Sequence, residues 1–222
     1  MLEMEAVTAR LPGRQLSYFA SLDSTMTEAA RLAAAGAPAG TAVIAEEQSA
    51  GQGRLGRSWH SEPGSGLYVT VVLRPRMAAE TLPALTLALG LAVAEAIARA
   101  ADVACDLRWP NDVMLGGRKV AGILAQAVEG AALAGIGINV NHPAFPEELA
   151  GLAVSLRMAT GREHSREELL AELLPAVDRF AGMLAEGGVK PVLELFERRS
   201  SYARGKRVEV EQPGGLVAGV TA

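Results

Sequence analysis

The chain has 222 residues, of which half are hydrophobic, with a formal net charge of −4 at pH 7 and a pI near 5.5. This composition predicts a soluble globular protein with one sizeable domain and a small appendage, and it argues against a general nucleic-acid binder, which needs a basic face. The single cysteine, Cys105, excludes an internal disulfide and favours the cytoplasm. Glu3 and Glu5, and apolar runs shorter than a membrane span, argue against secretion and membrane insertion.

The first half of the chain switches between helical and strand-like periods, which indicates an α/β or α+β domain. A helix is predicted for residues 25–35, where Thr25-Met26-Thr27-Glu28 fits a capping box and Gly36 and Pro38 end the helix. A long apolar helix is predicted for residues 81–101. Strands are predicted for residues 41–46, 67–73, 105–109, 113–115, 119–127 and 133–139. Short turns such as Gly116-Gly117-Arg118 make consecutive strands antiparallel, which argues against a doubly wound nucleotide fold and favours α+β.

The second half carries less chemistry. Helices are predicted for residues 166–186, with a kink at Pro175, and for 191–200. Residues 207–211 and 216–221 read as strands on either side of a turn at 212–215. Two strands do not make a stable module in water, so we interpret 203–222 as the opening of a small β-domain cut short; a hairpin leaning on the main domain, 1–202, is the alternative.

A glycine-rich loop at residues 50–59 is the most informative segment, because it combines Gly51, Gly53 and Gly56 with two arginines and Trp59. Glycine lets backbone N–H groups approach a ligand, and arginine presents paired donors that match phosphate or carboxylate oxygens. The indole of Trp59 offers a flat face to a ring such as adenine. The loop is therefore a candidate anion-binding loop, although a glycine-rich surface turn has the same composition.

Four other segments support this interpretation: Ser21-Leu22-Asp23-Ser24-Thr25, Arg108-Trp109-Pro110-Asn111-Asp112, residues 117–124, and Gly135-Ile136-Gly137-Ile138-Asn139-Val140-Asn141. In this order and at these spacings, the five segments resemble biotin protein ligases, which activate biotin with ATP and attach it to a lysine of a carboxylase carrier domain. The resemblance covers residues 17–145 closely. It implies an α+β fold like the catalytic domain of class II aminoacyl-tRNA synthetases, with a mixed, largely antiparallel sheet, flanking helices and an SH3-like C-terminal segment.

The resemblance also implies a biotin site. Ser24 and Thr25 take the place of the residues that bind the ureido ring, although helix capping also explains them, and Gln48 matches a glutamine that helps to fix biotin. Two positions depart from the family pattern, since Gln52 replaces an arginine and Met26 replaces an asparagine. The expected biotin-binding residues are Ser24, Thr25, Met26, Gln48, Gly51, Gln52, Gly53, Arg54, Lys119 and Gly122.

An adjoining ATP site follows from the same resemblance. Trp59 is expected to cover the adenine, with core packing as the alternative, and Asp112 is a candidate partner for a Mg²⁺ bridging the phosphates, with ordinary turn chemistry as the alternative. Arg108 stands where the family has lysine and receives no direct catalytic role. The expected ATP-binding residues are Arg54, Arg57, Trp59, Asn111, Asp112, Lys119 and Asn139.

Lys119 and Arg54 are the expected catalytic residues, because attack of the biotin carboxylate on the α-phosphorus of ATP accumulates negative charge that cations must neutralise. Strand alternation predicts that Lys119, Ala121 and Ile123 lie on one face, with the lysine at the start of an otherwise apolar row. The alternative is an ordinary lysine at the end of a strand that reaches into solvent. The expected product, biotinyl-5′-AMP, would then react with the lysine of a biotin carboxyl carrier domain.

Other readings stay open at this point. A lipoate or octanoate ligase shares the catalytic fold, and a non-catalytic biotinyl-adenylate-binding protein or an inactive relative would carry the same motifs. Residues 1–22 are too few for a helix-turn-helix domain, which argues against DNA binding and favours a monofunctional form. His60, His142 and His164 are scattered without ligand spacing, which argues against a metal centre held by protein ligands. A homodimer through sheet-edge pairing is left open.

Overall fold

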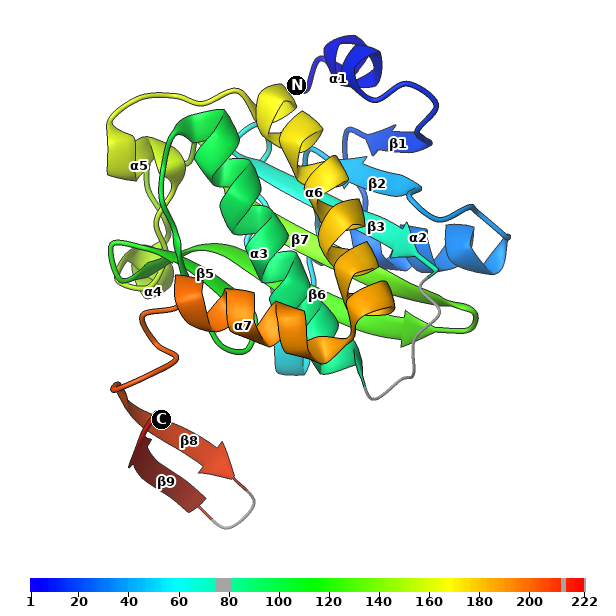
Figure 1. Cartoon of the computed structure of the whole chain (residues 1–222). Helices are drawn as coiled ribbons and strands as arrows, with labels where there is room; N and C mark the ends of the chain where they lie inside the picture. Colours follow the sequence, from blue (N-terminus) through cyan, green and yellow to red (C-terminus); the bar gives the residue numbers. More distant parts are fainter. Residues whose placement is uncertain (75–80, 213–214, 222) are drawn as a thin grey trace.

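The computed structural model describes residues 1–74, 81–212 and 215–221. A seven-stranded sheet forms the body of the molecule, in the order β1-β2-β3-β7-β6-β5-β4 (Figure 1). β1 and β2 are parallel, and all other neighbours in this sheet are antiparallel. The strands are β1 (Leu16–Phe19), β2 (Ala42–Ala45), β3 (Gly66–Leu73), β4 (Asp106–Arg108), β5 (Asp112–Leu115), β6 (Arg118–Val128) and β7 (Ala131–Asn139). The predicted mixed, largely antiparallel sheet is confirmed, and β1 was missed.

One face of this sheet is covered by the long helices α3 (Leu82–Ala101) and α6 (Arg166–Gly187), with α7 (Val189–Arg199) packed against both (Figure 1). α3 is long and apolar enough to cross a membrane, but 72% of its most apolar window is buried inside the protein, as in a core helix. α6 continues through Pro175 as one helix. The principal hydrophobic core lies between these helices and the sheet.

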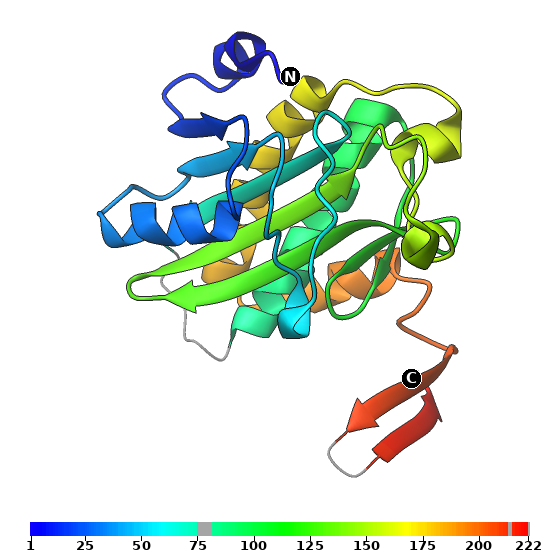
Figure 2. The same cartoon turned by 180° about the vertical axis from the view of Figure 1, so that it is seen from behind.

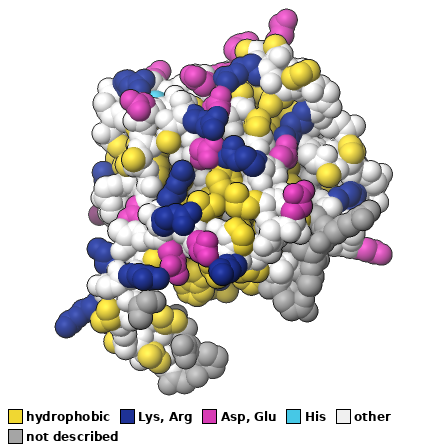
Figure 3. Space-filling model, viewed as in Figure 1, with side chains coloured by type: hydrophobic (Ala, Val, Ile, Leu, Met, Phe, Trp, Pro, Cys, Tyr) yellow, Lys and Arg dark blue, Asp and Glu magenta, His cyan; other side chains and the backbone are white. Residues whose placement is uncertain are grey.

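The outer surface of the helices carries both signs of charge close together (Figure 3). Glu95 of α3 pairs with Arg99 at 2.9 Å and with Arg179 of α6 at 2.7 Å, and α1 (Met4–Arg10) is attached to α6 by the Arg10–Glu172 pair at 2.7 Å. These partly exposed ion pairs each contribute less than about 1 kcal/mol, so burial of the apolar face is the main force that holds the helices to the sheet.

The other face of the sheet carries α2 (Thr25–Ala34), which packs Met26, Ala29 and Ala33 against the strands (Figure 2). Ser24 caps this helix, since its Oγ accepts a hydrogen bond from the Met26 N–H at 3.2 Å. The predicted capping box is wrong, because the Glu28 carboxylate pairs with Arg31 at 2.7 Å instead of reaching back to the start of the helix. α2 has only ten residues, so it leaves the rest of this face open for a loop.

Strand β7 presents different residues to the two faces. Ala134, Ile136 and Ile138 belong to the core under the helices, whereas Gly135 and Gly137 alternate with them on the opposite face. Gly137 lies directly opposite Gly122 of β6 in the sheet register. The face that carries α2, the glycine face, therefore has backbone without side chains at its centre, and this patch around Gly122 and Gly137 is its floor.

A β-bulge changes the direction of Lys119. Lys119 pairs with Met114 of β5, but the next residue of β5, Val113, pairs with Ala121, so that Val120 is an extra residue in β6. Val120 and Ala121 both lie in the helix-side core, and the Lys119 side chain lies over Gly122 on the other face. The prediction that Lys119, Ala121 and Ile123 share a face is wrong, because simple alternation does not survive a bulge.

A buried carboxylate joins the N-terminal segment to α6. Glu46, 3% exposed, forms a 2.9 Å ion pair with Arg166 and accepts hydrogen bonds from the Leu2 N–H, the Tyr18 hydroxyl and the Gly64 N–H. Burial alone raises the pKa of Glu46, but the hydrogen bonds and the charge of Arg166 outweigh that effect and leave the pKa below its ordinary value. Glu46 thus fixes four segments at the end of β2.

The C-terminal part begins with two short helices, α4 (Glu147–Ala150) and α5 (Leu156–Thr160), which connect β7 to α6. After α7, β8 (Arg207–Gln212) and β9 (Gly215–Val220) form a separate two-stranded antiparallel sheet (Figure 1). Both predicted strands are confirmed, and residues 213–214 of the predicted turn lie outside the described residues. The division of the chain between residues 202 and 203 stays a prediction.

Candidate functional site: two cavities on the glycine face

The glycine-rich loop follows β2 and crosses the glycine face of the sheet (Figure 2). It is closed by a hydrogen bond from the Gly53 N–H to the Arg57 carbonyl, 2.7 Å, and by another from the Trp59 N–H to the Gly51 carbonyl, 2.8 Å. Its tip is a short 3-10 turn, η1 (Arg54–Gly56), in which Leu55 has a left-handed φ of 57°. Such a backbone is strained for leucine, and the Leu55 side chain is 86% exposed.

Trp59 lies on the bare floor of the sheet. A Cβ added to Gly122 would come within 2.6 Å of the indole, and one added to Gly137 would overlap it as well. The indole therefore rests on the backbone of the Gly122–Gly137 pair. Within the described chain, its Nε1–H is buried and has no hydrogen-bond partner. An unpaired buried donor costs about 1–3 kcal/mol, so the indole N–H is energetically unfavourable in this position.

An inner cavity of about 50 Å³ lies between α2 and this floor. One end is polar, and a chain of hydrogen bonds fixes it: the Thr70 hydroxyl donates to the Thr25 hydroxyl at 2.8 Å, and Thr25 donates to Gln48 Oε1 from its hydroxyl at 3.0 Å and from its N–H at 2.8 Å. Gln48 Nε2 then donates to the Ser61 hydroxyl at 2.9 Å. These bonds set the orientation of the Gln48 amide.

Charged groups form one wall of the inner cavity. Lys119 Nζ lies 2.6 Å from Asp112 Oδ1 and 5.3 Å from the centre of the Trp59 ring, and Arg108 Nη2 lies 2.5 Å from the other oxygen of Asp112. Arg54 Nη1 donates to Asn111 Oδ1 at 3.3 Å. One carboxylate thus holds two cations, and the net charge at this wall is positive.

An outer cavity of about 360 Å³ lies on the far side of this wall. Trp59 and Lys119 line both cavities, so the two side chains separate one space from the other. The backbone of Lys119 is held in place, because its carbonyl accepts hydrogen bonds from the Asn139 amide at 3.3 Å and from the Val154 N–H at 3.0 Å. The backbone of Lys119 is thus fixed, and its ammonium group is paired with Asp112.

Nearly all residues selected from the sequence meet here. The inner cavity is lined by eleven of them: Ser24, Thr25, Met26, Gln48, Gln52, Gly53, Arg54, Trp59, Asn111, Lys119 and Gly122. The outer cavity adds Arg57, Asp112 and Asn139. Gly51 lines neither, and a Cβ there would meet the Trp59 carbonyl at 2.7 Å, so its smallness serves the packing of the loop.

The sequence analysis missed part of the inner cavity. Gly135, Gly137 and Leu124 line it as well. The signal for the glycines was present, because in Gly135-Ile136-Gly137-Ile138 every second residue of a buried strand lacks a side chain. Such alternation marks a strand whose one face is approached closely by a ring or a ligand.

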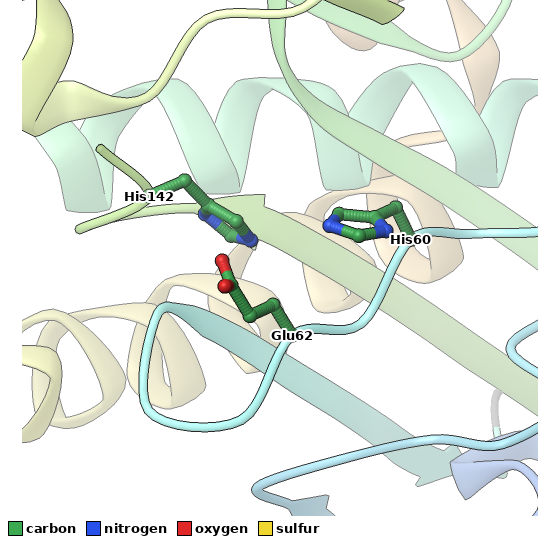
Figure 4. A group of neighbouring side chains, drawn as sticks. All are labelled: His60, Glu62 and His142. Carbon is green, nitrogen blue, oxygen red and sulfur yellow. The ribbon is translucent and has the colours of Figure 1, made fainter. Parts of the chain in front are cut away.

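A second group of polar side chains lies beside the outer cavity. His60, Glu62 and His142 come together, with one candidate ligand atom from each within 4.8 Å of the others (Figure 4). The expectation of scattered histidines is therefore wrong for His60 and His142, whose ring centres are 5.9 Å apart. Burial lowers the pKa of His142 to about 4, so its imidazole is neutral at neutral pH.

Comparison with known proteins gives the family. Residues 18–142 match the biotin/lipoate A/B protein ligase family. The chain belongs to this family. This chain is 38% identical over 200 residues to the bifunctional ligase/repressor BirA of Bacillus subtilis, and the match covers 87% of this chain and 61% of BirA. It is 35% identical to the biotin–[acetyl-CoA-carboxylase] ligase of Mycobacterium tuberculosis, covering 91% of this chain and 76% of that relative.

Solved structures agree with the family and with the predicted fold class. The biotin protein ligase of Aquifex aeolicus, in complex with biotin and ATP, superposes with a TM-score of 0.82 at 35% identity, covering 92% of this chain and 85% of that one. The resemblance inferred from the motifs is confirmed at the level of the family. This chain covers 61% of the length of the Bacillus subtilis BirA protein that it matches.

Proposed function

We propose that this biotin/lipoate ligase family member activates biotin with ATP to biotinyl-5′-AMP and transfers the biotinyl group to a lysine of a biotin carboxyl carrier domain. The observation that carries the proposal is the shared wall: Lys119 and Trp59 separate two cavities, one polar-ended and glycine-floored, the other rimmed by cations. This arrangement fits two substrates whose reacting ends must meet at a positive charge. The Aquifex aeolicus relative was solved in complex with biotin and ATP, the two substrates proposed here.

The inner cavity is the proposed biotin site. A ureido ring has one carbonyl acceptor and two N–H donors, and the fixed Thr25–Gln48 pair with Ser24 presents hydroxyl and amide groups of both kinds at one end. The rest of the bicyclic ring would lie on the Gly122–Gly137 backbone. The carboxylate at the end of the acyl chain would then reach the wall of Lys119 and Arg54.

Trp59 must move for biotin to enter. The inner cavity of about 50 Å³ holds a few water molecules, which is far less than a bicyclic ring and its chain require. The indole occupies the floor that the proposal assigns to the ligand, and its Nε1–H has no partner there. We therefore expect biotin to displace the indole from the Gly122–Gly137 pair. In its new place Trp59 would be free to cover the adenine of the nucleotide.

The outer cavity is the proposed ATP site, with Arg57, Asn111 and Asn139 as further nucleotide-binding residues. In this structure each oxygen of the Asp112 carboxylate contacts a cation, Lys119 or Arg108, so Asp112 would be free to bind Mg²⁺ only once Lys119 has moved to the phosphates. The predicted Mg²⁺ contact of Asp112 stays a prediction, and no step of the mechanism depends on it.

Charge determines the chemistry. When the biotin carboxylate attacks the α-phosphorus, negative charge gathers on the phosphoryl oxygens, and pyrophosphate leaves. Lys119 would exchange Asp112 for these oxygens and Arg54 would exchange Asn111, so that both cations act where charge develops. In the second half-reaction the amine of the acceptor lysine attacks the acyl carbon, and AMP leaves. The glycine loop would exclude water from the mixed anhydride in between.

A lipoate or octanoate ligase is the second candidate, since the matched family includes lipoate ligases by name. A lipoyl or octanoyl chain has no polar group to match the hydroxyl and amide groups of Ser24, Thr25 and Gln48, whereas the ureido ring of biotin has both donors and an acceptor. The polar end of the inner cavity therefore favours biotin. A biotinyl-adenylate-binding protein without transfer activity is the third candidate.

The test is ATP–pyrophosphate exchange with biotin, lipoate and octanoate offered separately, followed by transfer of labelled biotin to a biotin carboxyl carrier domain. We expect exchange with biotin alone and labelling of the carrier lysine. Exchange with lipoate or octanoate but not biotin would establish the second candidate. Exchange with biotin but no labelling would support the third.

Several expectations from the sequence stay predictions beside this proposal. They are the cytoplasmic location, the small C-terminal β-domain from residue 203, the absence of nucleic-acid and membrane partners, and the homodimer.

A further inference from the structure

His60, Glu62 and His142 form a group beside the outer cavity, and of the three only His60 lines that cavity. His60 and Glu62 precede β3, and His142 follows β7. The two segments meet because Gly66 of β3 pairs with Asn139 of β7 and because the Asn141 N–H donates to the Ser65 carbonyl at 2.6 Å. The sheet register therefore fixes the distance between the three side chains.

A hydrogen bond to Tyr68 sets the state of the His142 ring. The Tyr68 hydroxyl donates its proton to the Glu62 carbonyl at 3.0 Å, so that its oxygen is left to accept from His142 Nε2–H at 3.3 Å. This assigns the proton of the neutral ring to Nε2 and leaves a lone pair on Nδ1. Nδ1 is buried and has no hydrogen-bond partner among the described residues. A histidine that donates one ring N–H in this way keeps its other nitrogen available as a ligand atom.

The surroundings of the group are partly apolar. His142 is fully buried, and its ring stacks on Phe145 at 4.9 Å, while His60 meets the edge of Phe145 at 6.2 Å. Within residues 1–74, 81–212 and 215–221, the Glu62 carboxylate forms no ion pair that would neutralise it. Two imidazoles and one free carboxylate are thus brought together beside an apolar ring.

We propose that His60, Glu62 and His142 form a binding site for one borderline divalent ion of the Zn²⁺, Co²⁺ or Ni²⁺ class, with water in the remaining positions. Two imidazoles and a carboxylate select such ions, whereas Mg²⁺ prefers oxygen ligands alone. Donor atoms within 4.8 Å of one another close to about 3.4 Å around a tetrahedral ion with bonds of about 2.1 Å. Rotation of the His60 and Glu62 side chains, which lie on a loop, supplies this movement.

The site joins the end of the glycine-rich loop to the end of β7. Its first ligand, His60, directly follows Trp59, and Glu62 lies two residues further on. A bound ion would fix the exit of the loop while leaving Arg54 and Arg57 at its tip free to move. The ligand is a metal ion and not one of the proposed substrates, so its binding can be tested without biotin and ATP.

Calorimetric titration of the metal-free, untagged protein with ZnCl₂, without biotin or nucleotide, tests the proposal. We expect one Zn²⁺ per chain, a rise in Tm of roughly 5 °C at a hundredfold excess over Kd, and no competition from millimolar Mg²⁺. Co²⁺ should give the visible absorption of a nitrogen- and oxygen-ligated centre. Titration of the wild type with no heat and no change in Tm up to millimolar Zn²⁺ would overturn it.

Variants locate the site. His60→Gln and Glu62→Gln change half-exposed loop side chains, so the fold should survive, and each should weaken Zn²⁺ binding at least tenfold. Glu148→Gln is the matched control, because this exposed carboxylate lines the same surface groove as His60 and Glu62 but is not part of the cluster. Unchanged affinity in the first two variants, or an equal loss in the control, would contradict the assignment. The readout does not depend on ligase activity.

Discussion

The two faces of the seven-stranded sheet are built from alternate residues of the same strands, yet they differ completely. On the helix side, Ala134, Ile136 and Ile138 of β7 fill the space under α3 and α6. On the opposite side, Gly135 and Gly137 leave the backbone bare, and the loop that ends in Trp59 lies over it. The helix side gains stability from each buried side chain, at about 25 cal/mol per Å² of apolar surface.

The glycine side forgoes that gain and keeps space for a ligand. In β7, the even positions contribute to stability and the odd positions leave room for binding. Changes on the helix side should therefore alter unfolding, and changes on the glycine side should alter substrate use with little effect on unfolding.

The largest effect, a loss of stability, is expected from Glu46→Gln on the helix side of the sheet. The substitution leaves the buried guanidinium of Arg166 without its counter-charge, which typically costs about 3–5 kcal/mol of the free energy of unfolding. Urea denaturation measures the loss. Arg31→Gln is the control, because Arg31 is exposed and its pair with Glu28 should contribute little to the free energy of unfolding. Equal losses in the two variants would show that the buried pair has no special weight.

Lys119→Ala should act on the other side of the comparison. Loss of the cation at the wall between the cavities should lower biotin-dependent pyrophosphate exchange by about two to three powers of ten, with the free energy of unfolding little changed. Lys190→Ala, on the exposed side of α7, is the control and should exchange normally. Undiminished exchange in Lys119→Ala would remove Lys119 from the mechanism.

Gly137→Ala should give a smaller effect on the same face. Its new methyl group would overlap the space that the indole now fills and that biotin is proposed to take, so we expect roughly tenfold weaker biotin binding by calorimetry, about 1.4 kcal/mol. Gly182→Ala in α6 is the control, since a Cβ there meets nothing within 4 Å. Biotin affinity equal in both variants would place the ligand elsewhere.

The smallest effect is expected in the pH dependence of the free energy of unfolding, through Glu46 on the helix side. Because the folded-state pKa of Glu46 lies below its unfolded value, the folded state binds fewer protons, and the stabilisation is complete above a pH of about 4.5. It is lost as the pH falls through the folded-state pKa. Urea midpoints measured between neutral and acid pH should therefore fall less steeply for Glu46→Gln than for the wild type. Parallel curves would argue against this role.

The sequence predicted elements with strong local signals and missed those that depend on distant partners. The long helices and the strands from β2 to β7 have clear periodicity, and the motif residues Ser24, Gln48, Arg54 and Lys119 do meet in one place. β1 was missed because it is four residues long and its pairing partner, β2, begins at Ala42. Its hydrophobic pattern alone is too short to distinguish a strand from a loop.

Two further errors have the same origin. The bulge at Val120, which turns Lys119 onto the face of Gly122, depends on the register between β5 and β6. The meeting of His60 with His142 depends on the register between β3 and β7, and nothing in the 81 residues between them indicates it. Registers are set by tertiary packing, so neither side-chain direction could follow from local pattern.

The central claim is that biotin binds on the glycine floor in place of the Trp59 indole. The chain has two tryptophans, and Trp109→Phe leaves Trp59 as the single reporter. Titration of this variant with biotin should change the tryptophan emission saturably, with the same Kd that calorimetry gives. Biotin binding detected by calorimetry with no change in the emission of Trp59 would contradict the account.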